Sequence, residues 1–235
     1  MPKRILFIHH STGGNLIKEG HLREEVKSLD PDLEFWDHSY NLAPKLTMLL
    51  ARHTHLKGLS DAEGNITRTD YNIILSNNSP REYAEIFARD KDDQTLSAIL
   101  KFDVIAFKNC YPTTRISTKK QLQDDINYFD SIRESAKKYP DKKFVLVTPP
   151  PAKELTTNEE NSARALELVN YLTSQDYLQD TRNLAVFNFF GLLANKKGYL
   201  KPEYERFIPW DSHPNKKANQ DIAPIFAKLL VELTK

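Results

Sequence analysis

A hydroxyl-bearing turn follows the first apolar run of the chain. Residues 5–16, "ILFIHHSTGGNL", pass from four apolar residues through two histidines to a Ser-Thr-Gly-Gly sequence. We expect a strand to end near Ile8 and a helix to begin near Gly14, which leaves residues 10–13 in a tight turn that glycine permits. The free N–H groups and partial positive charge of a helix N-terminus favour an oxyanion, so Ser11 is a candidate nucleophile. Taken alone, a serine at this place more often simply caps the helix.

A candidate base lies near the other end of the sequence, in "FIPWDSHPN" (207–215). His213 precedes the last predicted helix, and Asp211 lies two residues before it. A serine hydroxyl is a poor nucleophile until a base removes its proton, and an imidazole oriented by a carboxylate does this near neutral pH. In "FKNCYP" (107–112), Asn109 follows a predicted strand, so its amide could donate a hydrogen bond to developing negative charge. Taken singly, His213 also fits a surface proline turn and Asn109 an ordinary loop.

Alternating strand and helix patterns would have to position these residues. Short apolar runs rich in Val, Ile and Phe predict five buried strands, at residues 4–8, 33–37, 103–107, 143–148 and 184–189. Amphipathic stretches predict helices at residues 15–29, 92–100, 119–138, 158–172 and 215–233. This alternation indicates an α/β fold with a parallel sheet between two helix layers. Because ligands of such folds collect at the carboxyl ends of the strands, Ser11, Asn109 and His213 are expected at one edge.

Residues 39–91 interrupt this alternation. The segment contains a turn signal at residues 61–65 and one short apolar run, so we interpret it as a polar loop insertion that forms a wall over the site. A connecting excursion without function is the equally frequent alternative.

The order of these motifs resembles that of the SGNH, or GDSL-like, hydrolase superfamily. "HHSTGGN", "FKNCYP", "VTPPP" and "DSHPN" carry the resemblance, which covers nearly the whole chain. The sequence also resembles one poorly characterised branch, in which "DHSYN", "GLSDAEGN" and "FKNCYP" have counterparts. The resemblance implies a flavodoxin-like α/β/α sandwich with a five-stranded parallel sheet, in which Ser11 is the nucleophile and His213 the general base. It further implies an oxyanion hole formed by Asn109 and the backbone N–H of Ser11.

Two positions depart from the superfamily pattern. No glycine follows the second predicted strand, where the sequence reads "DHSYN". In the superfamily a glycine at this place supplies an oxyanion donor. Here the backbone N–H of Tyr40 or Asn41, or the side chain of Asn41, would have to supply it. The superfamily aspartate normally lies three residues before the histidine, at the position of Trp210 here. Asp211 therefore either orients His213 or points elsewhere, in which case a backbone carbonyl orients the histidine.

Further polar residues are expected at the same edge. The candidates for substrate binding are His10, Gly13, His38 and Asn41. His38 is predicted either to contact substrate beside Ser11 or to be a satisfied polar group at a strand end. The alternative is a metal site that combines these histidines with His9 and Asp37. Successive residues of a strand point to opposite faces, so His9 and His10 cannot easily share one ion, and we expect no metal and no cofactor.

Composition narrows the classes of protein. The chain has 235 residues, 40% hydrophobic and 28% charged, and is expected to form a single domain over residues 1–235. Its 33 basic residues nearly balance its 32 acidic ones, so nucleic acid is not an expected partner. Cys110 is the single cysteine, which excludes an internal disulfide. No apolar stretch is long enough for a membrane span or a signal peptide, so we expect a cytoplasmic protein unless a leader has been removed.

Together these features predict a serine hydrolase that cleaves a carboxylic ester through an acyl-enzyme. An acetyl ester of a carbohydrate is the expected substrate, because many members of the resembled superfamily remove such groups and the predicted wall is polar; a lipid ester comes second. The alternative is a non-catalytic domain that binds a carbohydrate or another small ligand on a degenerate SGNH fold. The missing glycine and the displaced aspartate favour that alternative.

Overall fold

The computed structural model of the protein describes residues 2–39, 58–73 and 78–235. Within this part, six strands form one sheet in the order β3-β2-β1-β4-β5-β6. Their bounds are β1 Arg4–Ile8, β2 Glu34–His38, β3 Leu59–Ser60, β4 Val104–Lys108, β5 Lys143–Val147 and β6 Leu184–Phe187. β3 pairs with β2 in the antiparallel sense, and all other pairs are parallel. The sequence predicts five of these strands, and the sixth, β3, escapes prediction because two residues carry no periodic signal.

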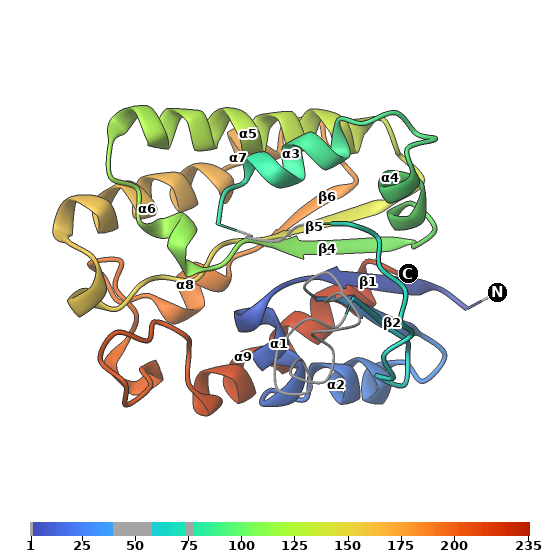
Figure 1. Ribbon diagram of the computed structural model, residues 1–235, viewed down its shortest axis with the longest axis horizontal. Coiled ribbons are helices and arrows are strands. Elements are labelled where there is room, and N and C mark those ends of the chain that lie inside the picture. Colours follow the sequence, from blue (N-terminus) through green and yellow to red (C-terminus); the bar gives the residue numbers. More distant parts are fainter. Residues whose placement is uncertain (1, 40–57, 74–77) are drawn as a thin grey trace, which may run out of the picture.

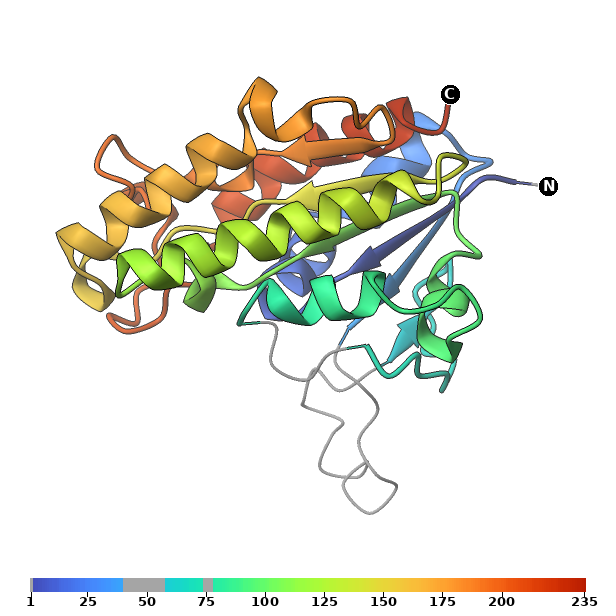
Figure 2. The same cartoon turned by 90° about the horizontal axis from the view of Figure 1, so that it is seen from above.

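Helices cover both faces of the sheet. The α-helices are α1 Ser11–Lys18, α2 Leu22–Leu29, α3 Arg81–Phe87, α4 Gln94–Ile99, α5 Lys119–Lys137, α6 Glu159–Leu172, α7 Gln175–Leu178, α8 Phe189–Leu193 and α9 Lys216–Glu232; short 3₁₀ helices are η2 Tyr111–Thr114, η3 Glu154–Thr156 and η4 Pro202–Tyr204. Helices α1, α2 and α9 lie below the sheet in Figure 1, and α3, α5 and α6 lie above it. Figure 2 shows α3, α5 and α6 side by side over the strands. The predicted three-layer α/β/α sandwich is confirmed. In the described ranges, no helix combines the length and the apolar character needed to cross a membrane.

Strand β1 shows why the sheet needs two helix layers. Ile5 and Phe7 belong to the core shared with α1, α2 and α9, whereas Leu6 and Ile8 belong to the core shared with α3, α5 and α6. All four side chains are buried. Since successive side chains of a strand point to opposite faces, a continuous apolar run is stable only with both faces covered.

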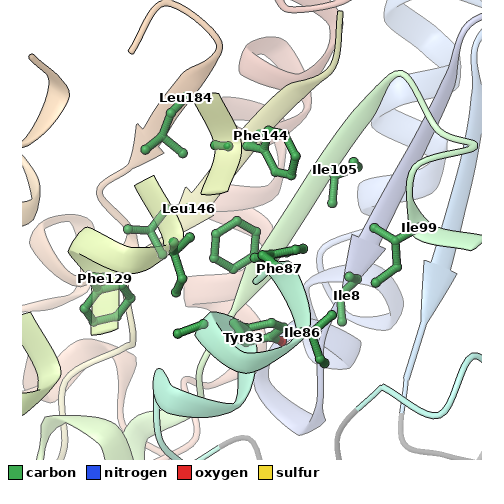
Figure 3. Packing of buried hydrophobic residues seen from close by; sticks show 14 of the residues in the cluster. Ile8, Tyr83, Ile86, Phe87, Ile99, Ile105, Phe129, Phe144, Leu146 and Leu184 are labelled. Atoms are coloured by element: carbon green, nitrogen blue, oxygen red, sulfur yellow. The ribbon is translucent and has the colours of Figure 1, made fainter. Parts of the chain in front are cut away.

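Part of the segment 39–91 joins the second of these cores. The predicted turn at 61–65 is present, since the Asp61 N–H donates to the Asn65 carbonyl at 2.9 Å. Beyond it, α3 packs on α5 and buries Phe87 among strand residues (Figure 3). The Phe87 ring lies edge-on to Phe144, with the centroids 5.6 Å apart. The segment is therefore not a polar loop throughout, and its predicted role as a wall over the site stays a prediction.

The first predicted helix, residues 15–29, is two helices in the structure. Residues 19–21 separate α1 from α2, and His21 has φ 57°, in the left-handed region. A Cβ at position 20 would lie 2.5 Å from the carbonyl oxygen of Asn219 in α9. Gly20 therefore permits α9 to approach the chain closely, and the helix breaks at this approach.

Candidate active site

Ser11 is the first residue of α1. The helix begins directly after His10, which occupies the N-cap position and makes no side-chain capping bond. The predictions of a helix start near Gly14 and of a capping role for Ser11 are therefore wrong. Gly13 explains the early start: it is buried, and a Cβ there would lie 2.4 Å from the Cβ of His9. Only glycine lets α1 fold this closely over the end of β1.

Ser11 faces His213, which lies in the loop before α9. The Oγ of Ser11 is 2.7 Å from Nε2 of His213, and Nδ1 of His213 is 2.5 Å from Oδ1 of Asp211. An ionised carboxylate only accepts hydrogen bonds, so Nδ1 carries the ring proton and Nε2 is left to accept the proton of Ser11. Of the two alternatives for Asp211, the structure has the one in which its carboxylate contacts His213.

The carboxyl group of Asp211 is held in its ionised form. Partial burial acts to raise the pKa of Asp211, but hydrogen bonds from the backbone N–H and the ring of His213 outweigh it. The backbone bond is 2.9 Å long. The pKa of Asp211 therefore lies below its ordinary value of 3.8, and the group is a carboxylate at neutral pH.

Buried polar contacts fix the loop that carries this pair. Ser212 is fully buried, and its Oγ accepts the N–H of Lys153 at 3.1 Å and lies 2.8 Å from Oγ1 of Thr156. The ammonium of Lys153, itself buried, donates to the carbonyl of Ile208 at 2.9 Å and to the carbonyl of Arg206. Figure 1 shows this loop, in orange-red, at the end of the sheet away from both termini. These buried hydrogen bonds hold the loop, and with it His213, in place next to Ser11.

An ion pair ties the same loop to α1 and α9. The guanidinium of Arg206 donates to both carboxylate oxygens of Glu19, at 2.8 and 2.9 Å. The side-chain amide of Asn219 in α9 donates to Glu19 at 2.7 Å. Glu19 directly follows α1. The helix that starts at Ser11 and the loop that carries His213 are therefore joined at a second point.

The predicted oxyanion donors lie at the same edge. The backbone N–H groups of Ser11, Thr12 and Gly13 have no hydrogen-bond partner within the described residues, as expected for the first turn of a helix. Asn109 is fully buried, and its amide donates to the carbonyl of Ser79 at 3.0 Å. One of its two amide hydrogens is thus engaged, and the role of Asn109 as an oxyanion donor stays a prediction.

The predicted substrate-binding residues lie in different parts of the structure. Gly13 and His10 are buried at the start of α1. His38 is fully buried: its Nδ1 lies 2.8 Å from the Ser39 carbonyl, and its Nε2 accepts the N–H of Tyr71 at 3.2 Å. Both ring nitrogens are engaged, which favours the role of a satisfied polar group over contact with substrate. Asn41 and Tyr40 lie outside the described residues.

The histidines of the metal alternative are engaged in protein contacts. His9 has Nε2 3.1 Å from Oδ2 of Asp37 and Nδ1 2.8 Å from the carbonyl of His10. Asp37 also pairs with the guanidinium of Arg23. Over the described ranges, no three His, Cys, Asp or Glu side chains converge as metal ligands would.

Three residues near Ser11 were not singled out by their types or spacing. Cys110 has its Sγ 3.5 Å from Oγ of Ser11 and 3.7 Å from Oγ1 of Thr12. The ammonium of Lys108 donates to the same Thr12 hydroxyl. Lys108 and Thr12 are fully buried, and burial lowers the pKa of Lys108 to about 8. The available signal was strand alternation, which places Lys108 on the same face as Val104, towards α1.

A small cavity opens beside α1. It has a volume of about 220 Å³ and is lined on one side by His9 and Gly14, and on the other by Arg23, Asp37 and Ser39. Its lining is mixed, with Ile17 beside the charged side chains of Lys18, Arg23 and Asp37. A larger cavity, of about 710 Å³, is lined by Leu33 and Glu34 at the start of β2. That cavity lies at the amino ends of the parallel strands, the opposite end from Ser11. The smaller cavity borders α1, the helix that begins at Ser11, but neither Ser11 nor His213 is part of its lining.

The sheet order and the helix layers define a class. The order of the strands and the two helix layers are those of the SGNH, or GDSL-like, hydrolase fold, and the protein has that fold. No protein-family model matches the sequence, and no curated protein matches it.

Solved structures show the likeness in detail. A "putative acylhydrolase" from Bacteroides fragilis is 12% identical, with a TM-score of 0.55, and the match covers 99% of this chain and 88% of that one. A GDSL-like lipase from Bacteroides thetaiotaomicron is 11% identical, with a TM-score of 0.53 and coverage of 99% and 89%. At this level of identity the likeness establishes the fold.

Proposed function

We propose that the protein is a serine hydrolase that cleaves carboxylic esters through an acyl-enzyme. The observation that carries the proposal is the contact of Ser11 Oγ with Nε2 of His213 at 2.7 Å, with Nδ1 of the same ring held by Asp211 at 2.5 Å. Such a chain gives a hydroxyl the base that it needs and gives the base a fixed tautomer. The names of the two similar structures, an acylhydrolase and a lipase, agree with this chemistry.

The reaction has two steps, acylation of Ser11 and hydrolysis of the acyl-enzyme. Ser11 Oγ attacks the carbonyl carbon of the ester while its proton passes to Nε2 of His213, and the carbonyl oxygen becomes an oxyanion. When the bond to the alcohol breaks, His213 returns the proton to the leaving oxygen, and the acyl group remains on Ser11. Water then attacks the acyl carbonyl carbon while its proton passes to His213; when the bond to Ser11 Oγ breaks, His213 returns this proton to Oγ and the carboxylic acid is released. Asp211 stays ionised and stabilises the imidazolium in both steps.

The unpaired N–H groups at the start of α1 suit the oxyanion. They point out of the first turn of the helix, where the helix dipole adds a partial positive charge. We further propose that the side-chain amide of Asn109, directly after β4, donates to the same oxyanion. The superfamily takes a further donor from the residues after the second strand; the candidates here, Tyr40 and Asn41, lie outside the described residues.

We extend the proposal to an acetyl ester of a carbohydrate, whose polyol part would reach from Ser11 into the cavity beside α1. The cavity of about 220 Å³ holds a small group, and Lys18, Ser39 and Ser60 on its lining provide polar contacts for a polyol. A lipid ester is the second candidate. It is favoured by Phe207 and Trp210, which are 102% and 76% exposed on the loop that carries His213.

Ester hydrolysis by three proteins tests the proposal. The parent, Ser11→Ala and His213→Ala proteins are compared on p-nitrophenyl acetate, on p-nitrophenyl octanoate and on an acetylated xylan. We expect the parent to hydrolyse the acetate and the xylan esters, and both variants to fall to the rate of buffer alone. Faster turnover of the octanoate would select the lipid candidate. Equal rates in all three proteins would leave only the non-catalytic binding domain.

A further inference from the structure

Besides its contact with His213, Ser11 is reached by a line of buried polar side chains. Lys108 at the end of β4 donates to the Thr12 hydroxyl; Thr12 Oγ1 lies 3.7 Å from Cys110 Sγ, and that sulfur lies 3.5 Å from Ser11 Oγ. Lys108 and Thr12 are fully buried, and Cys110 is 6% exposed. With His213 and Asp211, the line connects a cation to a carboxylate through the candidate nucleophile.

The hydrogen-bonding capacity of each group gives this line one direction. An ammonium only donates, so Thr12 Oγ1 accepts from Lys108 and directs its own hydrogen to the sulfur of Cys110. The S–H of Cys110 then points to Ser11 Oγ. The hydroxyl hydrogen of Ser11 is left for Nε2 of His213, which is the orientation that proton transfer requires. If the first group of the line could also accept a hydrogen bond, the hydrogen bonds could run in either direction.

The position of Lys108 is costly for the fold. Within the described residues no carboxylate lies within ion-pair distance of its ammonium, and the positive end of the α1 dipole is next to it. The ionisable group that faces the ammonium is the thiol of Cys110, whereas the hydroxyl of Tyr83 lies on the opposite, α3 face of the sheet and donates to the backbone carbonyl of Lys108. Neither requires a cation. An apolar residue of the same length would fill this space without that cost.

We propose that Lys108 is a positioning residue, which acts through Thr12 and Cys110 to direct the hydroxyl hydrogen of Ser11 towards His213. This inference rests on the proposed function, since it assigns a role to residues behind the same nucleophile. The inference goes beyond the proposed function because it assigns a role to Lys108, Thr12 and Cys110, which the contact between Ser11 and His213 does not require.

A fluorophosphonate probe with a fluorescent tag tests the proposal in a single turnover. Ser11 Oγ attacks phosphorus, fluoride leaves, and the proton passes to His213, so the labelling rate reports the reactivity of Ser11 without any choice of ester. Rates are measured from pH 6 to 10 for the parent, Lys108→Met, Thr12→Val and Thr12→Ser. Lys101→Met, which removes an exposed lysine, is the control.

We expect Lys108→Met and Thr12→Val to be labelled about tenfold more slowly at pH 7, as the loss of one hydrogen bond predicts. Thr12→Ser, which keeps the hydroxyl, should recover most of the rate. The parent should lose rate above pH 8, where an uncharged Lys108 can accept the hydrogen of Thr12, and Lys108→Met should lack this decrease. A role in packing alone would not produce a pH-dependent difference.

The outcomes separate the two proposals. A parent protein without label at Ser11 overturns the proposed function and the inference with it. A labelled parent, with Lys108→Met and Thr12→Val labelled at the parent's rate and pH dependence, overturns the inference alone. If Lys108→Met does not fold, the pair at position 12 decides by itself, because Thr12→Val and Thr12→Ser differ in the hydroxyl that the inference needs.

Discussion

Ser11 and His213 lie 202 positions apart in the sequence, yet their side chains are in hydrogen-bonding contact. The neighbouring Asp211 is two residues before the histidine rather than three, and its carboxylate still reaches Nδ1. It does so because the same oxygen also accepts the backbone N–H of His213, which folds the three residues into a tight turn. The carboxylate of Asp211 thus contacts His213 in spite of its displaced position in the sequence.

Asp211→Asn tests the contribution of this carboxylate. The amide cannot stabilise the imidazolium and can favour the wrong tautomer, so we expect ester hydrolysis to slow by about a hundredfold or more. Because the pKa of Asp211 is lowered, its contribution to stability is present above pH 3.8 and is lost as the pH falls through the folded-state pKa. The variant should therefore show a smaller loss of stability in acid. Asp221→Asn, which alters an exposed ion pair, is the control and should retain parental activity.

Asn109→Ala tests the predicted oxyanion hole. A donor of this kind contributes roughly 3 kcal/mol to the transition state, so acyl transfer should slow by about a hundredfold or more. KM for a p-nitrophenyl ester should change much less than kcat, because the bond forms to the oxyanion. Turnover at the parental rate would show that the bond to Ser79 is the main role of this amide.

Lys108→Met should be more stable than the parent at pH 7. Burial lowers the pKa of Lys108 from 10.5 to about 8, which corresponds to a cost of roughly 3 kcal/mol for its charged form. The unfolded chain then holds more protons than the folded one between pH 8 and 10.5, so parental stability should rise with pH in that window. Urea unfolding of the variant should show a higher midpoint at pH 7 and no such rise. A less stable variant with the same rise would contradict this account.

Some of the residues around Ser11 could be predicted from the sequence, and others could not. Taken singly, Ser11 also fitted a helix cap and His213 a surface turn; they could be named because their order in the chain, with Asn109 between them, resembles that of the SGNH superfamily. Lys108 and Cys110 flank Asn109 and carried no pattern of their own. Their proximity to Ser11 follows from the pairing of β1 with β4, which sequence spacing does not reveal. The two ring contacts of His38 are likewise tertiary.

At the level of elements, the start of α1 decides where the nucleophile lies. Gly13 packs against the side chain of His9, whereas a Cβ on Gly14 would meet its nearest atom, Cε1 of His9, at an ordinary 3.5 Å. The two neighbouring glycines therefore carry very different constraints. The sequence predicted a turn here because two glycines normally end regular structure, and the close packing of helix on strand overrode that preference.

Gly13→Ala and Gly14→Ala form a matched pair. The first should displace α1 from β1, lower the free energy of unfolding by about 1–3 kcal/mol and reduce ester hydrolysis. The second adds a methyl group where there is room, and alanine favours a helix, so its stability should be equal or slightly higher. Thermal unfolding and p-nitrophenyl acetate hydrolysis measure both. Equal losses in the two variants would contradict the packing that we describe.

At the level of the whole molecule, parallel pairing brings distant segments to one edge. The carboxyl ends of β1 and β4 are neighbours, so residues 9–13 and 108–110 meet there, and the loop before α9 closes over them. The alternation of strands and helices predicted this arrangement because each strand is apolar on both faces. It predicted the segment 39–91 least well, since α3 is short and its contacts with α5 are distant in sequence.

The proposed hydrolase activity depends most on the reactivity of the Ser11 hydroxyl. Incubation of the parent protein with the fluorophosphonate probe, followed by proteolysis and mass spectrometry, measures it directly. We predict one added phosphonyl group, on the peptide that contains Ser11, and no label on Ser11→Ala. Label on Cys110, label that persists in Ser11→Ala, or a folded parent protein that takes up no label would contradict the assignment of Ser11 as the nucleophile.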